Sequence, residues 1–383
     1  MPSYPTYKLG EIARSTKGKK PKTISKEKTN GFEIPYVDIK AFEKGIIDNY
    51  TDGENCIFCT PDDVLIVWDG ARCGFVGRGI EGAIGSTLAK ISSEEYINDY
   101  LFYFLQSKYK VLNSNPRGVG IPHIEPNLLW NFEIPDIDKT TQHQIVSRIE
   151  SLFAELDKAV EHLRTAQQQL KTYRQAVLNH WLNNEDGKWE MVKLGDVADM
   201  CLGKMLDKNK NKGTYQPYLR NVNVRWGSFD LDDLLEMKFE ESEQERYGIQ
   251  IGDLIMCEGG EPGRCAIWDV DVPNMKIQKA LHRIRVKKLV YNKFVYYLFL
   301  LYAQNGRLEK YFTGTTIKHL TGQSLKTVEI PLPLLPEQKR IVKEIETRLS
   351  QAEAAEARIA EALQKTEALR QSILKKAFSG ELV

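Results

Sequence analysis

Two long stretches of this chain carry apolar residues at alternating gaps of three and four positions, and neither stretch contains proline or glycine. Such spacing predicts one continuous helix with a narrow apolar seam in each stretch. The seam consists of Ile145, Ile149, Leu152, Leu156, Leu163, Leu170 and Val177 in the first helix, and of Ile341, Ile345, Ile359, Leu369 and Ile373 in the second. Any fold of this chain has to cover both seams.

The simplest partner for each seam is the other helix. Both seams are rich in alanine, for example Ala159 and Ala352, and small side chains let two helix backbones approach closely. About 42 residues at 1.5 Å per residue make a rod of roughly 60 Å. We therefore expect an antiparallel coiled coil that acts as a spacer between two globular domains related by a pseudo-twofold axis.

An internal repeat supports two globular domains. The sequence YKLGEIA at Tyr7–Ala13 returns as VKLGDVA at Val192–Ala198, and Glu-Ile-Pro precedes each long helix. Short strand and helix patterns alternate irregularly between these points, which favours an α+β fold without a regular βαβ order. The expected organisation is a globular domain at 1–140, a long helix at 141–182, a second globular domain at 183–336 and a second long helix at 337–383.

Composition excludes several classes of function. The formal net charge is only +1, so any affinity for nucleic acid has to come from local clusters. Cys56 and Cys59 have the spacing of a zinc knuckle, but no second pair follows, and we expect no metal site. No nucleotide-binding glycine motif is present. The chain has neither the layout of a signal peptide nor an apolar run that could cross a bilayer, so we expect it in the cytoplasm.

Lysine-rich and glycine-rich loops at matching positions of the repeat are candidates for contact with DNA. Lysines can bind phosphates without reading sequence, and their alternative role is plain solvated loop charge. Arg72 and Arg264 lie in glycine loops, where a guanidinium group can reach a guanine edge or stabilise the turn. The lysine candidates are Lys17, Lys19, Lys20 and Lys22 in the first repeat and Lys204 and Lys208 in the second.

Further candidates come from one strand-like segment and two loops. Asn221, Asn223 and Arg225 alternate with two valines, which predicts that all three project from one face of a strand. There they can pair with adenine and guanine, or the segment can be an ordinary half-exposed strand. Arg220, directly before them, is a candidate as well. His123 and His319 occupy matching positions, where each can contact DNA or serve as a structural hydrogen-bonding residue. Glu258 can accept a hydrogen bond from a cytosine amino group or cap a turn. The remaining candidates are Ser86, Thr87, Arg117, Lys279 and Lys318. The acidic stretch 231–247 is expected to be a solvated loop.

Several sequence strings, in their order along the chain, resemble those of a known protein family. The relevant strings include DVLIVWDGARCG (Asp63–Gly74), GTTIKHLTG (Gly314–Gly322) and PLPLLPEQKRIV (Pro331–Val342). With them, the whole chain resembles the specificity subunit of type I restriction-modification systems. The resemblance implies two target-recognition domains that read an asymmetric, bipartite target in double-stranded DNA. It also implies long helices that hold two methyltransferase subunits, to which restriction and translocase subunits are added.

The resemblance further implies a subunit without catalysis of its own. It requires no cofactor in this chain, because S-adenosylmethionine, ATP and Mg²⁺ are expected on the partner subunits only. A different hypothesis is a two-headed scaffold that binds two proteins and no DNA. Recovery of a gapped DNA motif would separate the two. A nuclease pattern formed from Asp136, Asp186 and Lys188 is disfavoured, because the first long helix intervenes.

Overall fold

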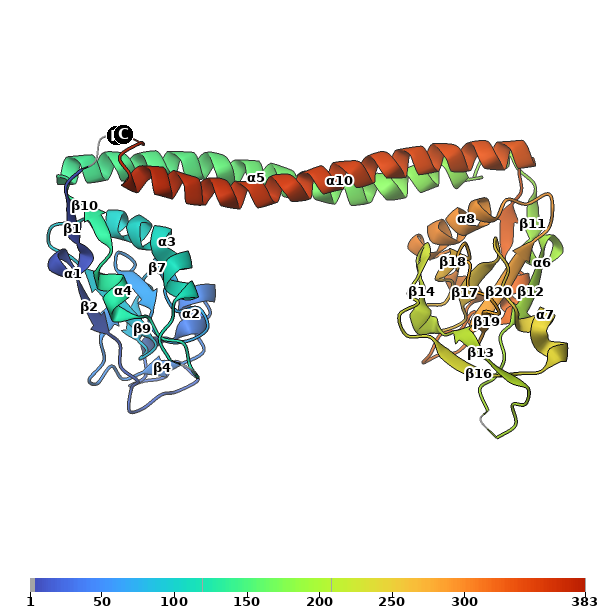
Figure 1. Cartoon of the computed structure of the whole chain (residues 1–383), viewed down its shortest axis with the longest axis horizontal. Coiled ribbons are helices and arrows are strands. Elements are labelled where there is room, and N and C mark those ends of the chain that lie inside the picture. Colours follow the sequence, from blue (N-terminus) through green and yellow to red (C-terminus); the bar gives the residue numbers. More distant parts are fainter. Residues whose placement is uncertain (1–3, 119, 208, 383) are drawn as a thin grey trace. The chain divides into compact units, whose positions relative to one another are not determined.

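The computed structural model describes residues 4–118, 120–207 and 209–382. The chain divides into two compact units, which are Met1–Arg164 with Ala360–Val383 (unit 1) and Thr165–Ile359 (unit 2). Each unit combines a globular domain with parts of two long helices, α5 (Lys139–Leu182) and α10 (Leu335–Phe378) (Figure 1). No helix in the described residues has the length and apolar character needed to cross a membrane.

The globular domain of unit 1 is built from three sheets with strand orders β1-β10, β2-β9-β6-β7 and β4-β3-β8-β5. Its strands are β1 (Thr6–Lys8), β2 (Arg14–Lys17), β3 (Ile34–Val37), β4 (Tyr50–Thr51), β5 (Phe58–Cys59), β6 (Val64–Val67), β7 (Val76–Arg78), β8 (Gly82–Ile84), β9 (Leu88–Ser92) and β10 (Glu133–Pro135). Its short helices are α1 (Leu9–Ile12), α2 (Ile39–Lys44), α3 (Asn98–Ser114) and α4 (Pro126–Trp130).

The globular domain of unit 2 repeats this plan with sheets β11-β21, β12-β20-β17-β18 and β16-β13-β19, and adds the hairpin β14-β15. Its strands are β11 (Met191–Lys193), β12 (Ala198–Leu202), β13 (Thr214–Leu219), β14 (Val224–Arg225), β15 (Ser228–Phe229), β16 (Leu235–Phe239), β17 (Leu254–Cys257), β18 (Cys265–Ile267), β19 (Lys276–Ile277), β20 (Leu281–Val286) and β21 (Glu329–Pro331). Its helices are α6 (Leu194–Val197), η1 (Asn221–Asn223), η2 (Glu241–Glu243), α7 (Gln244–Tyr247), α8 (Asn292–Gln304), η3 (Glu309–Tyr311) and α9 (Gly322–Lys326).

The two domains repeat each other down to single backbone hydrogen bonds. The Gly18 amide donates to Leu88 O at 2.9 Å, and the Gly203 amide donates to Leu281 O at the same distance. A Cβ atom at Gly18 or at Gly203 would lie 2.3 Å from a carbonyl oxygen of the facing strand segment, so both positions need glycine. The expected α+β class and the internal repeat are confirmed.

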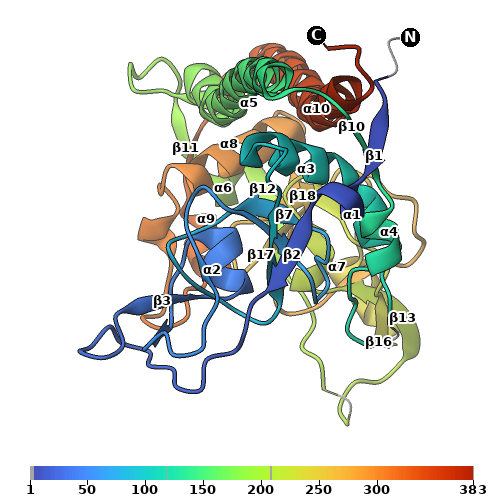
Figure 2. The same ribbon diagram turned by 90° about the vertical axis from the view of Figure 1, so that its left-hand side faces the viewer.

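The core of unit 1 joins the globular domain to both long helices. Tyr100 and Phe104 of α3 pack against Phe378 of α10, with ring centroids 5.2 and 5.3 Å apart. Ile145 and Ile149 of α5 belong to the same buried cluster. Figure 2 shows α3 lying between the two long helices and the strands of this unit. The helical seam is therefore part of a larger core, in keeping with the apolar face that a surface helix buries.

Helices α5 and α10 run antiparallel, as expected. Asp157 pairs with Arg370 inside unit 1, and Arg174 pairs with Glu356 at 2.7 Å inside unit 2. Most of the expected seam residues are buried or half-buried: Ile145, Ile149, Leu152, Leu156, Leu163, Leu170, Val177, Ile341, Ile345, Ile359 and Ile373.

The prediction for Leu369 is wrong, because this side chain is 50% exposed. Continuing the spacing of four and three from Ile359 leads to Leu363, Thr366 and Arg370, all of which are half-buried. Arg370 lies over the Phe153 ring, with its guanidinium carbon 4.7 Å from the ring centroid. The seam thus passes through polar residues here, and the pattern of apolar residues alone placed it one position too early.

One glutamine in the first turns of each long helix ties that helix to its globular domain. In unit 1, Gln142 Oε1 accepts from the Ile97 amide at 2.9 Å, and its Nε2 donates to Ile137 O and Glu95 O at 3.0 and 3.3 Å. In unit 2, Gln338 makes the same three bonds with Tyr291, Pro333 and Leu289 at 2.7, 2.8 and 3.1 Å. Both glutamines are buried, so each amide group is satisfied without water.

Candidate nucleic-acid interface

In unit 1 the carboxyl group of Asp69 contacts two of the predicted residues, Lys17 and His123. Lys17 ends β2, and its Nζ lies 2.7 Å from Asp69 Oδ2. His123 Nδ1 lies 2.6 Å from the other oxygen of the same carboxyl group. Burial would raise the pKa of Asp69, but the hydrogen bonds from Lys17 and His123 outweigh it and lower the pKa. Asp69 was not among the sequence candidates, although its place two residues after β6, in an Asp-Gly pair, marks the turn on which it sits.

Backbone pairing fixes the position of each candidate histidine. In unit 1 the amides and carbonyls of Arg117 and His123 bond each other at 2.8 and 2.9 Å. In unit 2 those of Thr313 and His319 do so at 2.8 Å in both directions. The predicted structural match between His123 and His319 is thus confirmed. Their surroundings differ, because Gly259 stands where unit 1 has Asp69, and a Cβ atom there would lie 2.8 Å from His319 Nδ1.

The other candidates of unit 1 lie mainly at its surface. Arg72 pairs with Glu43 at 2.9 Å and lies over the Phe75 ring, 4.1 Å from its centroid. The Thr87 carbonyl accepts from the Trp68 amide at 2.8 Å, which supports the turn that carries Asp69. The exposed candidates are Lys19, Lys20, Lys22, Ser86 and Arg117.

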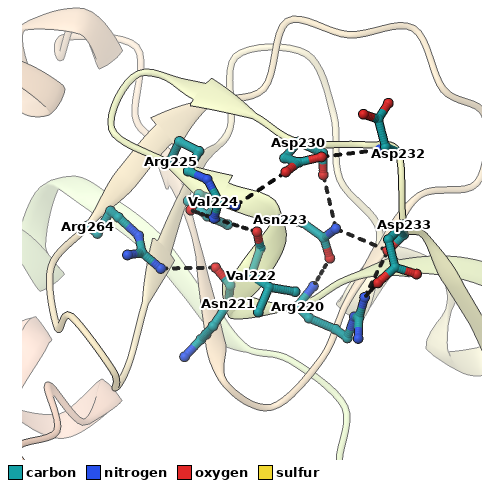
Figure 3. Close-up of polar contacts among 10 residues, drawn as sticks. All are labelled: Arg220, Asn221, Val222, Asn223, Val224, Arg225, Asp230, Asp232, Asp233 and Arg264. Atoms are coloured by element: carbon teal, nitrogen blue, oxygen red, sulfur yellow. Dashed lines mark hydrogen bonds and ion pairs between the residues drawn. The ribbon is translucent and has the colours of Figure 1, made fainter. Parts of the chain in front are cut away.

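In unit 2 each of the three candidate arginines pairs with an acidic side chain, and Figure 3 shows the pairs made by Arg220 and Arg225. Arg220 pairs with Asp233 at 2.7 Å, and Arg225 pairs with Asp230 at 3.2 Å. Arg264 pairs with Glu261 at 2.7 Å and also donates to Asn221 O at 3.1 Å. The prediction that Asn221, Asn223 and Arg225 share one strand face is wrong, because 221–223 forms the 3-10 helix η1.

Local side-chain bonds explain why this segment turns. The Asn223 side chain is almost fully buried; its Oδ1 accepts from the Arg220 amide at 2.8 Å and its Nδ2 donates to Asp230 O at 3.0 Å. The Asn221 amide group donates to Gly259 O at 2.8 Å. Asparagine competes with strand pairing through such bonds. The structure therefore gives Asn223 a structural role, and it removes Asn223 from the candidates for direct contact.

Lys204 is also structural. It is only 7% exposed, and its Nζ donates to Lys238 O at 3.0 Å and to the Glu243 carboxylate. Glu243 belongs to the acidic stretch 231–247, which contains β16, η2 and α7. Most acidic residues of this stretch are exposed, as expected, but the expectation of a loop is wrong, because the stretch forms a strand and two short helices. Two of its carboxylates also hold Lys204 and Arg220. Such a pairing depends on tertiary contacts that sequence position does not reveal.

The last candidates of unit 2 fall into three groups. Lys279, Lys318 and His319 are exposed, and Lys318 lies 3.9 Å from Glu309. Glu258 is half-buried, and its carbonyl accepts from the Leu320 amide at 2.7 Å. Lys208 lies outside the described residues. Among the described residues no group of three or more His, Cys, Asp or Glu side chains could hold a metal ion.

Comparison with known proteins identifies the class of protein that this repeated domain defines. A family model described as "Type I restriction modification DNA specificity domain" matches residues 3–163 and 186–365, which is most of the chain and both copies of the repeat. The chain belongs to this family. It is a DNA sequence-specificity subunit of a type I restriction-modification system, as its resemblance to that subunit implied.

Relatives and solved structures agree with this assignment. The chain is 27% identical to the type I restriction enzyme MjaVIII specificity subunit of Methanocaldococcus jannaschii, over 89% of this chain and 84% of that protein. It is 25% identical to the EcoKI specificity subunit of Escherichia coli, over 84% and 75% of the two chains. The fold resembles that of the HsdS subunit from Thermoanaerobacter tengcongensis, with a TM-score of 0.66, 21% identity and coverage of 100% and 98%.

Proposed function

We propose that this subunit reads an asymmetric, bipartite sequence in double-stranded DNA, with one half read by each globular domain. The observation that carries this proposal is the pair of matching histidine loops. Both loops are held by the same backbone bonds, yet His123 has Asp69 beside it and His319 has Gly259. A shared scaffold with different side chains suits two related reading heads that recognise different bases.

The partners in this proposal are two methyltransferase subunits, joined by restriction and translocase subunits. Support comes from the relatives, which are named as specificity subunits of restriction enzymes. The first turns of α5 also offer a surface for a partner, because an open groove there is lined by Thr140, His143, Gln144, Ser147, Arg148, Ser151 and Leu382. In this proposal the chain performs no catalysis, and S-adenosylmethionine, ATP and Mg²⁺ bind to the partner subunits. The assembly acts in the cytoplasm, where its DNA target lies.

Selection from random DNA tests this function. The full chain, purified with its methyltransferase subunits, is mixed with a random duplex library at low salt, and the retained DNA is sequenced. We expect enrichment of two short, different sequence elements at a fixed gap. Arg72→Gln should change the enrichment of only one element, because Arg72 belongs to unit 1 alone. Absence of any enriched sequence would overturn the proposal and favour a scaffold that binds two proteins without DNA.

A further inference from the structure

The Asp69 carboxylate determines which nitrogen of His123 carries a proton. Its pKa is lowered, so at neutral pH the group is charged and can only accept hydrogen bonds. His123 Nδ1, 2.6 Å from Asp69 Oδ1, must therefore be the donor. The second carboxylate oxygen is taken by Lys17 at 2.7 Å, so each oxygen of Asp69 has one partner.

The opposite edge of the His123 ring is open. The side chain is 45% exposed, and no described residue forms a hydrogen bond with Nε2. Gly118 borders this edge, and a Cβ atom there would lie 3.3 Å from His123 Cδ2. Because Nδ1 already holds the proton of a neutral ring, Nε2 of that ring is a hydrogen-bond acceptor that points away from Asp69.

We propose that Asp69 is a positioning residue for sequence reading, which holds His123 so that Nε2 accepts a hydrogen bond from the exocyclic amino group of adenine or cytosine. This inference rests on the proposed function and assigns the contact to the half-site that unit 1 reads. Adenine N6 and cytosine N4 are the amino donors in the major groove, whereas guanine and thymine present acceptors at the corresponding places.

Unit 2 lacks this device at the matching position. Gly259 replaces the carboxylate, and Leu202 occupies the position on β12 that corresponds to Lys17 on β2. Within the described residues no side chain forms a hydrogen bond with the His319 ring. No neighbouring side chain therefore determines which ring nitrogen of His319 carries the proton. The proposed dependence of base reading on the tautomer applies to His123 alone.

The substitution Asp69→Asn tests the proposal, measured by the DNA selection described above on the complex with its methyltransferase subunits. An amide can accept from Nδ1 or donate to it, so the substitution lets the ring proton move to Nε2 and turns the acceptor into a donor. At one base-pair position, the preference for an amino-bearing base should fall about tenfold, in line with the loss of one direct base contact. His123→Ala should abolish the preference at that same position.

Two further variants serve as controls. Lys17→Gln removes the ion pair but keeps the bond between Asp69 and His123, and it should weaken retention of all sequences without changing base preference. His319→Ala should leave the half-site read by unit 1 unchanged. Thermal unfolding, and an unchanged preference for the half-site that unit 2 reads, show that each variant is folded. If Asp69→Asn does not fold, the base preference of His123→Ala tests the contact.

The outcomes are distinct. A loss confined to one position in both the Asp69 and the His123 variants supports the proposal. An even loss across the whole half-site, or no change at any position, overturns it, because a structural role would produce no effect on a single base. If the wild-type complex enriches no gapped sequence at all, the proposed function itself has failed, and Asp69 is not the cause.

Discussion

Replacement of Gln142 by leucine should destabilise unit 1 severely while leaving the helix itself intact. Leucine is a good helix former of similar size, so the loss is that of the three hydrogen bonds to Ile97, Ile137 and Glu95. Gln142 is 1% exposed, and a leucine side chain in its place would keep water from the three backbone groups that Gln142 now pairs. The expected effect is therefore the cost of buried, unpaired backbone groups.

The magnitude follows from the number of groups left unpaired. Each buried amide or carbonyl without a partner costs about 1–3 kcal/mol, and the three together give a loss of about 3–5 kcal/mol when partial relaxation is allowed. For a unit of this size, 1 kcal/mol lowers the midpoint of thermal unfolding by about 2–4 °C. The midpoint for unit 1 should therefore fall by about 6–20 °C.

Differential scanning calorimetry of the full chain checks this value. Gln338→Leu should have the same effect on unit 2, because Gln338 makes the equivalent three bonds. Gln144→Leu is the matched control, since Gln144 lies on the same helix as Gln142 but is exposed. A shift below about 2 °C for Gln142→Leu, or an equal shift for the control, would refute the view that this glutamine fastens the helix to the domain.

Three other outcomes are expected. Gly18→Ala should cost about 1–3 kcal/mol in urea unfolding, because its Cβ would meet Gly85 O at 2.3 Å, whereas Gly120→Ala meets nothing within 4 Å and should be neutral. Burial would raise the pKa of Asp63, but hydrogen bonds from Lys90 and Thr60 lower it below the usual 3.8. Unit 1 should therefore lose stability as the pH falls below about 3.8. Asp63→Asn should flatten that dependence in unfolding curves measured from pH 7 to pH 3. Asp233→Asn removes the charged partner of Arg220 but keeps its bond to the backbone carbonyl of residue 233. It should strengthen binding to random DNA and steepen its salt dependence by about one unit in log–log slope. An unchanged slope would show that Arg220 stays away from phosphate.

The long helices, the repeat and the fold class could be predicted because each depends on a pattern that is visible along the chain. Alternating gaps of three and four need no knowledge of distant residues, and neither does the return of a similar heptapeptide. The prediction failed at Leu369, where the apolar pattern was followed although the seam continues through Thr366 and Arg370. Polar residues can occupy a seam when a partner such as Asp157 is within reach.

The candidate site could be predicted only in part, because side-chain roles depend on neighbours far along the chain. The lysine-rich loop predicts a phosphate contact for Lys204, but Glu243, 39 positions further along the chain, binds its Nζ. The role of Asp69 could not be predicted from its own segment, because its partner His123 lies 54 positions later. Gly18 and Gly203 occupy matching positions of the repeat, and the reason for glycine at both is the close approach of a neighbouring backbone.

The packing of Phe378 against Tyr100 and Phe104 has a consequence for synthesis of the protein. The first domain emerges from the ribosome early, yet part of its core is supplied by residues after Ala360. The intervening residues 165–359 take about 10–40 s to translate at 5–20 residues per second. During that interval the aromatic face of α3 is left uncovered, so the domain made first is completed last, and its nascent form is a natural client for chaperones.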